Sequence, residues 1–197
     1  MALVLLAGVA LVRTGAEGSG PPQPEAASVA DGVVADPTPA SVTALPASRP
    51  GRVLIPAIGV DAPVAEVGRD KEGWIDAPPP ENKNLAGWYT GSVTPGERGT
   101  AVVVGHVDNL SGPAVFFRLG ELRIGAHIDV RRADGRTAVF DVYRVRTFMK
   151  KGFPAQQVYG GTGRPELRVI TCGGAYATST GYDGNIVVFA RLTSSRG

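Results

Sequence analysis

The sequence contains very few of the residues from which cofactor sites and disulfide bonds are built. It has one cysteine, Cys172, so an internal disulfide bond is excluded. With only two histidines beside it, no zinc-binding spacing can be formed, and no glycine-rich loop lies between a strand and a helix. The net charge of +2, without a basic stripe, argues against binding to nucleic acid. We therefore expect no cofactor, no metal and no nucleic-acid partner.

The sequence also lacks an apolar run long enough to cross a bilayer as a full helix, which needs about 20 residues. The first residues, "MALVLLAGVALV", are apolar up to Arg13. We interpret residues 1–13 as a signal-peptide hydrophobic region or the remnant of a membrane anchor, with a buried helix as the alternative. Residues 14–50 are rich in Pro, Ala, Ser and Gly and bury too little apolar surface to offset their ordering entropy, so we expect a disordered linker.

Residues 51–195 are expected to form one all-β domain, because short apolar runs alternate with turn residues and no long amphipathic helix occurs. The clearest hairpin has two alternating runs joined at Asp134-Gly135, a strong turn signal. Residues 114–122 have the apolar spacing of a short helical turn. Six to eight such strands predict a closed β-barrel or a sandwich.

The alternation in the hairpin predicts which side chains fill the barrel. A shift of one residue would exchange the two faces of each strand. The expected interior residues are Ile128, Val130, Val139, Phe140 or Val142, and Tyr143 or Val145.

The lone cysteine ends an apolar strand, "LRVITC", and two glycines follow it. A cysteine nucleophile needs a neighbouring base to form its thiolate. His106 ends another apolar strand, "TAVVVGH", so the two side chains would meet if these strands are neighbours. His127 begins a strand and is expected to be a polar surface residue. An inert, buried Cys172 is the alternative, because free cysteine often behaves as a small apolar residue.

A cysteine acyl-transfer site also needs a donor for the developing oxyanion. Arg168 lies four residues before Cys172, which places both on one face of a strand, roughly 13 Å apart. Asn185 and Arg191 lie on the last predicted strand. Gly173 begins a pair of glycines whose backbone N–H groups could approach a ligand closely. The sequence leaves these alternatives open.

Several segments together resemble the sortases, and most closely the actinobacterial class F group. They are "GHVD" at 105–108, the "GPAVFFRLGELRIGAHIDV" stretch, "LRVITCGG" and "GYDGNIVVFA". The likeness covers about residues 51–193, essentially all of the predicted domain. It implies a closed sortase-type β-barrel of about eight strands with short helical connections.

The resemblance also implies roles for individual residues. Cys172 matches the family's nucleophile, with Thr171 beside it, and His106 matches the family's histidine. The position of the family's arginine is occupied by Asn185, which is a departure from the pattern. Asn185 or Arg168 is then the expected oxyanion donor. The expected substrate contacts are Thr171, Gly173 and Arg191.

By this resemblance, the protein is a surface cysteine transpeptidase. It would cleave a Leu-Pro-x-Thr-Gly-like sorting signal on a secreted protein through a Cys172 thioester, and transfer the acyl group to the amine of a peptidoglycan precursor. It would act at the extracellular face of the cytoplasmic membrane, tethered by its N-terminus. A secreted cysteine hydrolase and a non-enzymatic β-barrel binding module with an inert thiol are the alternatives. Some sortases bind calcium, but we expect the nearby carboxylates to be solvated; they are Asp61, Glu66, Asp70 and Glu72.

Overall fold

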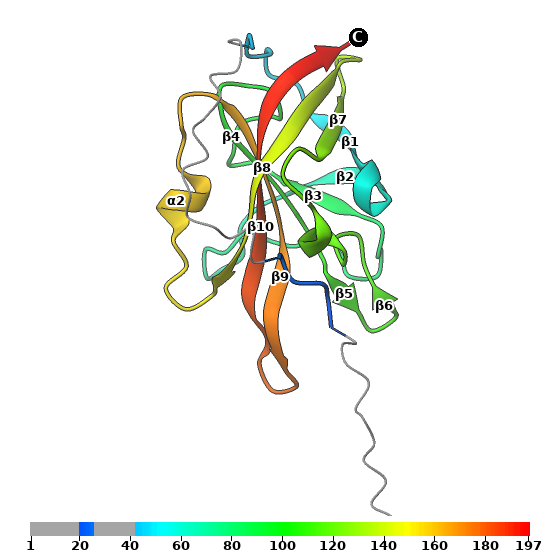
Figure 1. Cartoon of the computed structure of the whole chain (residues 1–197), viewed down its shortest axis with the longest axis vertical. Coiled ribbons are helices and arrows are strands. Elements are labelled where there is room, and N and C mark those ends of the chain that lie inside the picture. The colour runs from blue at the N-terminus through cyan, green and yellow to red at the C-terminus, as the bar shows by residue number, and fades with distance from the viewer. Residues whose placement is uncertain (1–19, 26–41) are drawn as a thin grey trace, which may run out of the picture.

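The computed structural model describes residues 20–25 and 42–197 of the chain. β-strands dominate this part, and its helices are short turns between strands (Figure 1). The first half contains β1 (Pro50–Ile55), η1 (Pro56–Ile58), β2 (Val60–Val67), β3 (Ala86–Tyr89), β4 (Gly99–Gly105), β5 (Asp108–Asn109) and β6 (Gly112–Pro113). The second half contains η2 (Leu119–Glu121), β7 (His127–Arg132), β8 (Thr137–Met149), α2 (Ala155–Tyr159), β9 (Pro165–Ala177) and β10 (Gly181–Arg196).

Eight of these strands close into a barrel, which confirms the predicted fold. Their order is β1-β2-β3-β4-β9-β10-β8-β7, and β7 pairs with β1 to complete the circle. The pairs β2–β3 and β4–β9 are parallel, and the other pairs are antiparallel. Strands β5 and β6 form a separate small hairpin. Strand β9 therefore lies between β4 and β10, a position that decides the geometry of the site.

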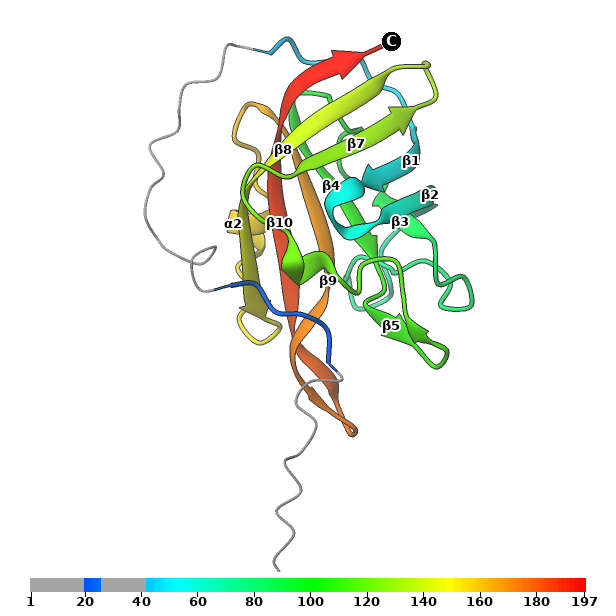
Figure 2. The same ribbon diagram turned by 45° about the vertical axis from the view of Figure 1, so that its right-hand side comes forward.

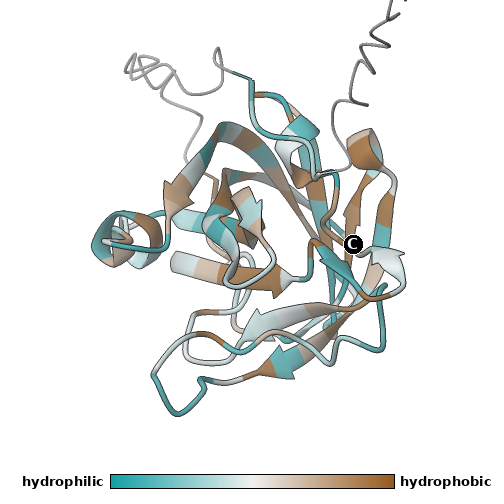
Figure 3. Cartoon of the chain, turned by 90° about the horizontal axis from the view of Figure 1, so that it is seen from below, coloured by the Kyte–Doolittle hydropathy of each residue, from teal (hydrophilic) through white to brown (hydrophobic). Residues whose placement is uncertain are grey.

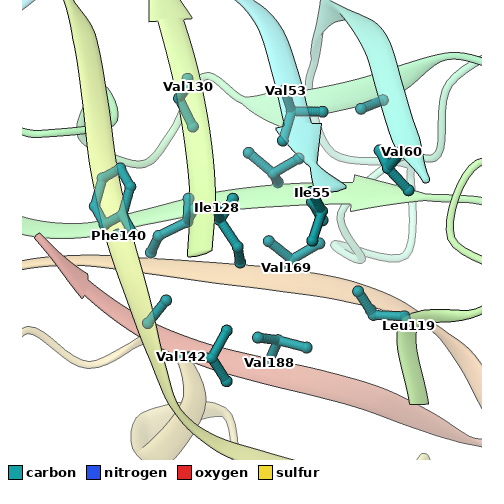
Figure 4. Close-up of a cluster of buried hydrophobic side chains, with 14 of the residues drawn as sticks. Val53, Ile55, Val60, Leu119, Ile128, Val130, Phe140, Val142, Val169 and Val188 are labelled. Atoms are coloured by element: carbon teal, nitrogen blue, oxygen red, sulfur yellow. The ribbon is translucent and has the colours of Figure 1, made fainter. Parts of the chain in front are cut away.

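The barrel interior is filled by aliphatic and phenylalanine side chains, which we call the inner cluster (Figure 4). Phe140 of β8 pairs with Ile128 of β7, and both are fully buried within it. Val130, Val142 and Val145 also point inward, as predicted. The prediction was wrong for Val139, which lies outside this cluster. Alternation explains the difference, because a strand that turns Phe140 inward turns the preceding residue outward.

The predicted turns also occur where the sequence places them. Strand β7 ends at Arg132 and β8 begins at Thr137, so the Asp134-Gly135 hairpin is confirmed. The predicted helical turn at residues 114–122 contains the 3₁₀ turn η2. Figure 3 shows the corresponding pattern of hydropathy, with apolar stretches on barrel strands and polar stretches in connecting loops.

A second apolar group, the outer cluster, covers the outside of the sheet formed by β4, β9 and β10. Helix α2 packs on it through Val158. Its buried members are Val67, Val102, Val104, Val158, Ile170, Val187 and Phe189. Its partly buried border consists of Ile75, Tyr89, Tyr143, Phe148 and Phe153. This face carries aromatic side chains near solvent, in contrast to the closed interior.

The predicted N-terminal segment, residues 1–13, lies outside the described residues, as does most of the predicted linker at 14–50. The described parts of that linker contact the domain. Leu45 belongs to the inner cluster, and the Gln23 side chain accepts a hydrogen bond from the Gly174 backbone N–H at 3.2 Å. Figure 2 shows residues 20–25, in blue, passing across the lower part of β9 and β10. None of the helices in the described ranges is long and apolar enough to cross a membrane.

Candidate active site

The strand register brings the end of β4 and interior positions of β9 and β10 together around Cys172. Asn185 of β10 is the direct partner of Cys172 across the antiparallel β9–β10 pair. On the other side, Val104 of β4 pairs with Ile170 in the parallel β4–β9 ladder. The ladder ends there; extended by two residues, the same register would set His106 opposite Cys172. Because Ile170 belongs to the outer cluster, alternation places Cys172 on the same outer face.

A buried hydrogen bond joins β9 to the end of β4 directly before the cysteine and the histidine. The Thr171 hydroxyl donates to the Gly105 backbone carbonyl at 2.8 Å. Thr171 is only 3% exposed, so its side chain is sealed between the strands. This contact joins the residue before Cys172 to the residue before His106. Thr171 therefore supports the site from behind, in contrast to the substrate contact that the resemblance implied.

Backbone contacts hold His106 in place after β4 ends. Its carbonyl accepts a hydrogen bond from the Phe116 N–H at 3.1 Å. The Phe116 ring packs so closely on Gly105 that a Cβ there would lie 2.6 Å from it, which explains the glycine of the "GH" pair. The His106 Nε2 lies 2.7 Å from the Pro78 carbonyl oxygen. A carbonyl can only accept, so Nε2 carries the hydrogen and donates it.

Cys172 is partly buried, and burial is the main cause that raises the pKa of its thiol above the ordinary value. Two charges modify this effect. The Lys150 ammonium lowers the pKa of the thiol, and the Asp108 carboxylate raises it. The thiolate is therefore the minor form near neutral pH, so the site needs its charged neighbours to populate the reactive form.

Sequence reasoning missed several residues around the thiol. The Pro78 carbonyl beside His106, and Lys150 and Asp108 near Cys172, come from loops or short strands whose approach depends on the tertiary fold. Asp108 also accepts a hydrogen bond from the Tyr182 hydroxyl, at 2.5 Å, which links the loop after His106 to the β9–β10 hairpin. The "GHVD" motif contained Asp108 and was the one available signal for it.

The other candidate residues lie at different distances from the thiol. Gly173 is buried and pairs with Gly184 directly beyond the Cys172–Asn185 pair. Gly174 has a φ of 85°, a backbone conformation that suits glycine, at the point where the hairpin bends away from the barrel. Arg191 lies six residues beyond Asn185 on β10, roughly 20 Å along the strand. The structure thus brings Gly173 to the site and leaves Arg191 remote from it.

Arg168 shares the outer face with Cys172, but its guanidinium group is engaged elsewhere. The side chain is 2% exposed and forms an ion pair with Glu166 at 2.6 Å. It also donates to the Val158 carbonyl at 2.9 Å and lies over the Phe189 ring, 4.5 Å from its centroid. These contacts tie helix α2 to β9 and β10. The structure does not bring the Arg168 guanidinium to the thiol.

The four carboxylates considered for calcium lie along and after β2. Asp61 pairs with Arg52, and Glu66 pairs with Arg49 at 3.0 Å. Within residues 20–25 and 42–197, no three His, Cys, Asp or Glu side chains are arranged to hold a metal ion.

The barrel and the paired strand ends can be compared with known proteins. The sortase domain model matches residues 53–193, and the chain therefore belongs to the sortase family, whose members are cysteine transpeptidases. Sortases generally act at the cell surface, on proteins that carry a sorting signal and on amines of cell-wall precursors. Among curated proteins, none matches the chain significantly.

Several solved sortases share the fold at low sequence identity. The SrtA sortase from Actinomyces oris is 21% identical, with a TM-score of 0.59, and the match covers 78% of this chain and 88% of that one. Sortase A of Listeria monocytogenes is 16% identical, with a TM-score of 0.56 and coverage of 76% and 90%. Sortase A of Corynebacterium diphtheriae is 18% identical, with a TM-score of 0.57 and coverage of 76% and 62%. These similarities support the barrel architecture.

Proposed function

We propose that this sortase cleaves a Leu-Pro-x-Thr-Gly-like sorting signal with Cys172 as the nucleophile and transfers the acyl group to the amine of a peptidoglycan precursor. The observation that supports the proposal is the pairing of Cys172 with Asn185, together with the β4–β9 register, which favours His106 as the neighbour on the other side. A nucleophile, a proton carrier and an amide donor are the groups that acyl transfer requires. We further propose that it belongs to the actinobacterial class F group and acts outside the cytoplasmic membrane, tethered by residues 1–13 and the segment at 14–50.

In the first half-reaction, the Cys172 thiolate attacks the threonine carbonyl carbon of the signal. The side-chain N–H of Asn185 donates to the oxyanion. The C–N bond to glycine then breaks, and the His106 imidazolium gives its proton to the departing amine. Because Nε2 is held by the Pro78 carbonyl, Nδ1 is the ring nitrogen that transfers this proton.

In the second half-reaction, the acceptor amine attacks the Cys172 thioester. His106, now neutral, takes a proton from the attacking nitrogen, and the thiolate leaves. The thiolate and the imidazolium must both be present at the start of each cycle. Since burial raises the pKa of the thiol, only a minor fraction of the enzyme is competent at neutral pH, and a bell-shaped pH profile is expected.

The outer cluster supplies the surface for the apolar part of the signal. Ile170 and Val104 precede Cys172 and His106 on the outer face, and Phe148 pairs with Asn185 across β8 and β10. The leucine and proline of a bound signal would contact the partly buried border of this cluster, including Phe148, while the threonine carbonyl reaches the thiol. The partly buried aromatic border of this cluster keeps the surface accessible at its edges.

The test is a covalent trap. Incubation of the full chain with a Leu-Pro-x-Thr-Gly peptide, without an amine acceptor, should add the mass of the acyl fragment up to threonine to Cys172. The Cys172→Ala variant should show no adduct and no cleavage. Unchanged cleavage by Cys172→Ala would overturn the proposal, as would a native thiol that resists alkylation but reacts after unfolding.

A hydrolase would form the same thioester, so the product decides between the two reactions. A transpeptidase yields the amide when a primary amine is added after the thioester has formed. A hydrolase yields only the free carboxylate at every amine concentration. The thiol of a non-enzymatic barrel would form no thioester at all.

A further inference from the structure

A cavity of about 780 Å³ lies between the β5–β6 hairpin and the β9–β10 hairpin. The outer cluster covers β9 residues before the cysteine, whereas this cavity is bordered by Tyr176, four residues after it. Its other walls come from Tyr182 on β10 and from the β5–β6 hairpin. Figure 2 shows that hairpin and the β9–β10 hairpin extending from the same end of the barrel. We call this space the distal cavity.

Neither Cys172 nor His106 is among the residues that line the distal cavity, but Asp108 in its wall relates it to both. Asp108 follows His106 by two residues and accepts the hydrogen bond of Tyr182. The Asp108 carboxylate is also close enough to Cys172 to raise the pKa of the thiol. A molecule in this cavity would therefore lie beside Asp108, next to the segment that carries His106 and near the part of β9 that follows Cys172.

The lining of the distal cavity is anionic and aromatic. Glu81 and Asp108 are its carboxylates, and no lysine or arginine is among the described residues that line it. The rings of Tyr176 and Tyr182 lie 5.0 Å apart, centroid to centroid, at its edge. Burial raises the pKa of Tyr182, so its hydroxyl stays protonated and donates to the Asp108 carboxylate. Carboxylates and aromatic faces together favour a cation.

Resting on the transpeptidase function proposed above, we propose that the distal cavity binds the acceptor substrate as a primary ammonium on a peptide-like chain. Asp108 and Glu81 attract the ammonium, and the tyrosine pair contacts the chain that carries it. The bound ammonium first releases one proton to water. The neutral nitrogen then attacks the thioester carbonyl, the C–S bond breaks, and a second proton passes to neutral His106 as the Cys172 thiolate leaves.

The test measures how a preformed thioester partitions between an amine and water. The full-length enzyme is acylated with the sorting-signal peptide, and triglycine amide is added at increasing concentration. Asp108→Asn keeps an oxygen that accepts from Tyr182 but removes the charge, and Glu81→Gln removes the second charge. Each variant should lower the ratio of amide to hydrolysis product about tenfold at low amine, by loss of one charge-assisted contact. Glu72→Gln, which removes an equal charge on the β2–β3 connection, should leave the ratio unchanged.

A second acceptor separates binding of charge from other effects. Hydroxylamine is uncharged at neutral pH, so its reaction with the thioester should be nearly insensitive to Asp108→Asn and Glu81→Gln. If both variants keep the wild-type ratio with triglycine amide while thioester forms normally, the distal cavity is not the acceptor site, although the proposed function stands. If the wild-type enzyme forms no thioester, the proposed function itself fails. Equal loss with triglycine amide and hydroxylamine would also overturn the ammonium proposal.

Discussion

The inner and outer clusters lie on opposite faces of the same strands, yet they are built differently. The inner cluster consists of aliphatic and phenylalanine side chains. The outer cluster surrounds a buried ion pair, Arg168–Glu166, and has aromatic residues at its border. A closed apolar interior suits stability, whereas a partly open surface can exchange its contacts with water for contacts with a substrate. Because side chains alternate between the two faces, one face of each strand contributes to stability and the other is available for binding.

The largest expected effect on activity comes from the replacement of His106, which follows β4. His106→Ala should lower the transpeptidation rate by about 10²- to 10⁴-fold, because the leaving amine loses its proton donor. The matched control is His127→Ala, since His127 is exposed and pairs with Asp141 on the wall formed by β7 and β8. That control should keep full activity. Equal losses in the two variants, measured with the same peptide and amine, would contradict the assignment.

Truncation of one aromatic residue in each cluster compares their contributions to stability. Phe140→Ala in the inner cluster should lower the free energy of unfolding by about 3–5 kcal/mol, since Phe140 is 0% exposed. Phe153→Ala at the border of the outer cluster should cost less, because its ring is partly buried, but should raise the apparent KM for the sorting-signal peptide. Urea unfolding and peptide kinetics measure both. A stability loss as large for Phe153→Ala would show that the outer border is part of the core.

Asn185 tests whether an amide replaces the arginine found in other family members. Asn185→Ala should lower the acylation rate by about 10²- to 10³-fold, the usual loss when one oxyanion donor is removed. Arg191→Gln, six residues further along β10, is the control and should acylate at nearly the wild-type rate. Single-turnover formation of the Cys172 adduct gives the rate directly. The reverse order of effects would assign the oxyanion contact to the distant arginine.

The fold could be predicted because its signals are local. The Asp134-Gly135 turn and the alternation around Phe140 determine a hairpin from sequence alone. Val139 shows where this reasoning fails, since several adjacent apolar residues fit either face and only the packed barrel chooses one.

The site could be predicted in part. The expected strand end at Cys172 was wrong, because β9 continues to Ala177 through its pairing with β10. The sequence positions of Cys172 and His106 also do not say that β4 and β9 are parallel neighbours. The pairing of Asn185 with Cys172 also depends on the register of two long strands. Contacts from loops, such as the Pro78 carbonyl on His106, have no sequence signature, because they arise only when the barrel closes.

The smallest expected effect concerns the charges on either side of the thiol. Lys150 lowers the pKa of Cys172, so Lys150→Gln should raise it and shift alkylation by iodoacetamide to higher pH. Asp108 raises the same pKa, and Asp108→Asn should shift the profile to lower pH. Only the thiolate reacts, and Cys172 is the sole cysteine, so the profile reports this group alone.

The adjacent Lys151→Gln variant controls for a general change in charge near the loop, and its profile should match the wild type. Added salt should reduce the difference between the two profiles, because mobile ions screen the exposed Lys150 ammonium of the wild type. If both lysine variants shift the profile equally, Lys150 acts only through the overall charge. The pKa of the Cys172 thiol is then set mainly by its burial between β4 and β10. If Lys150 alone matters, the outer face carries a specific charge beside its nucleophile, which the closed inner face could not accommodate.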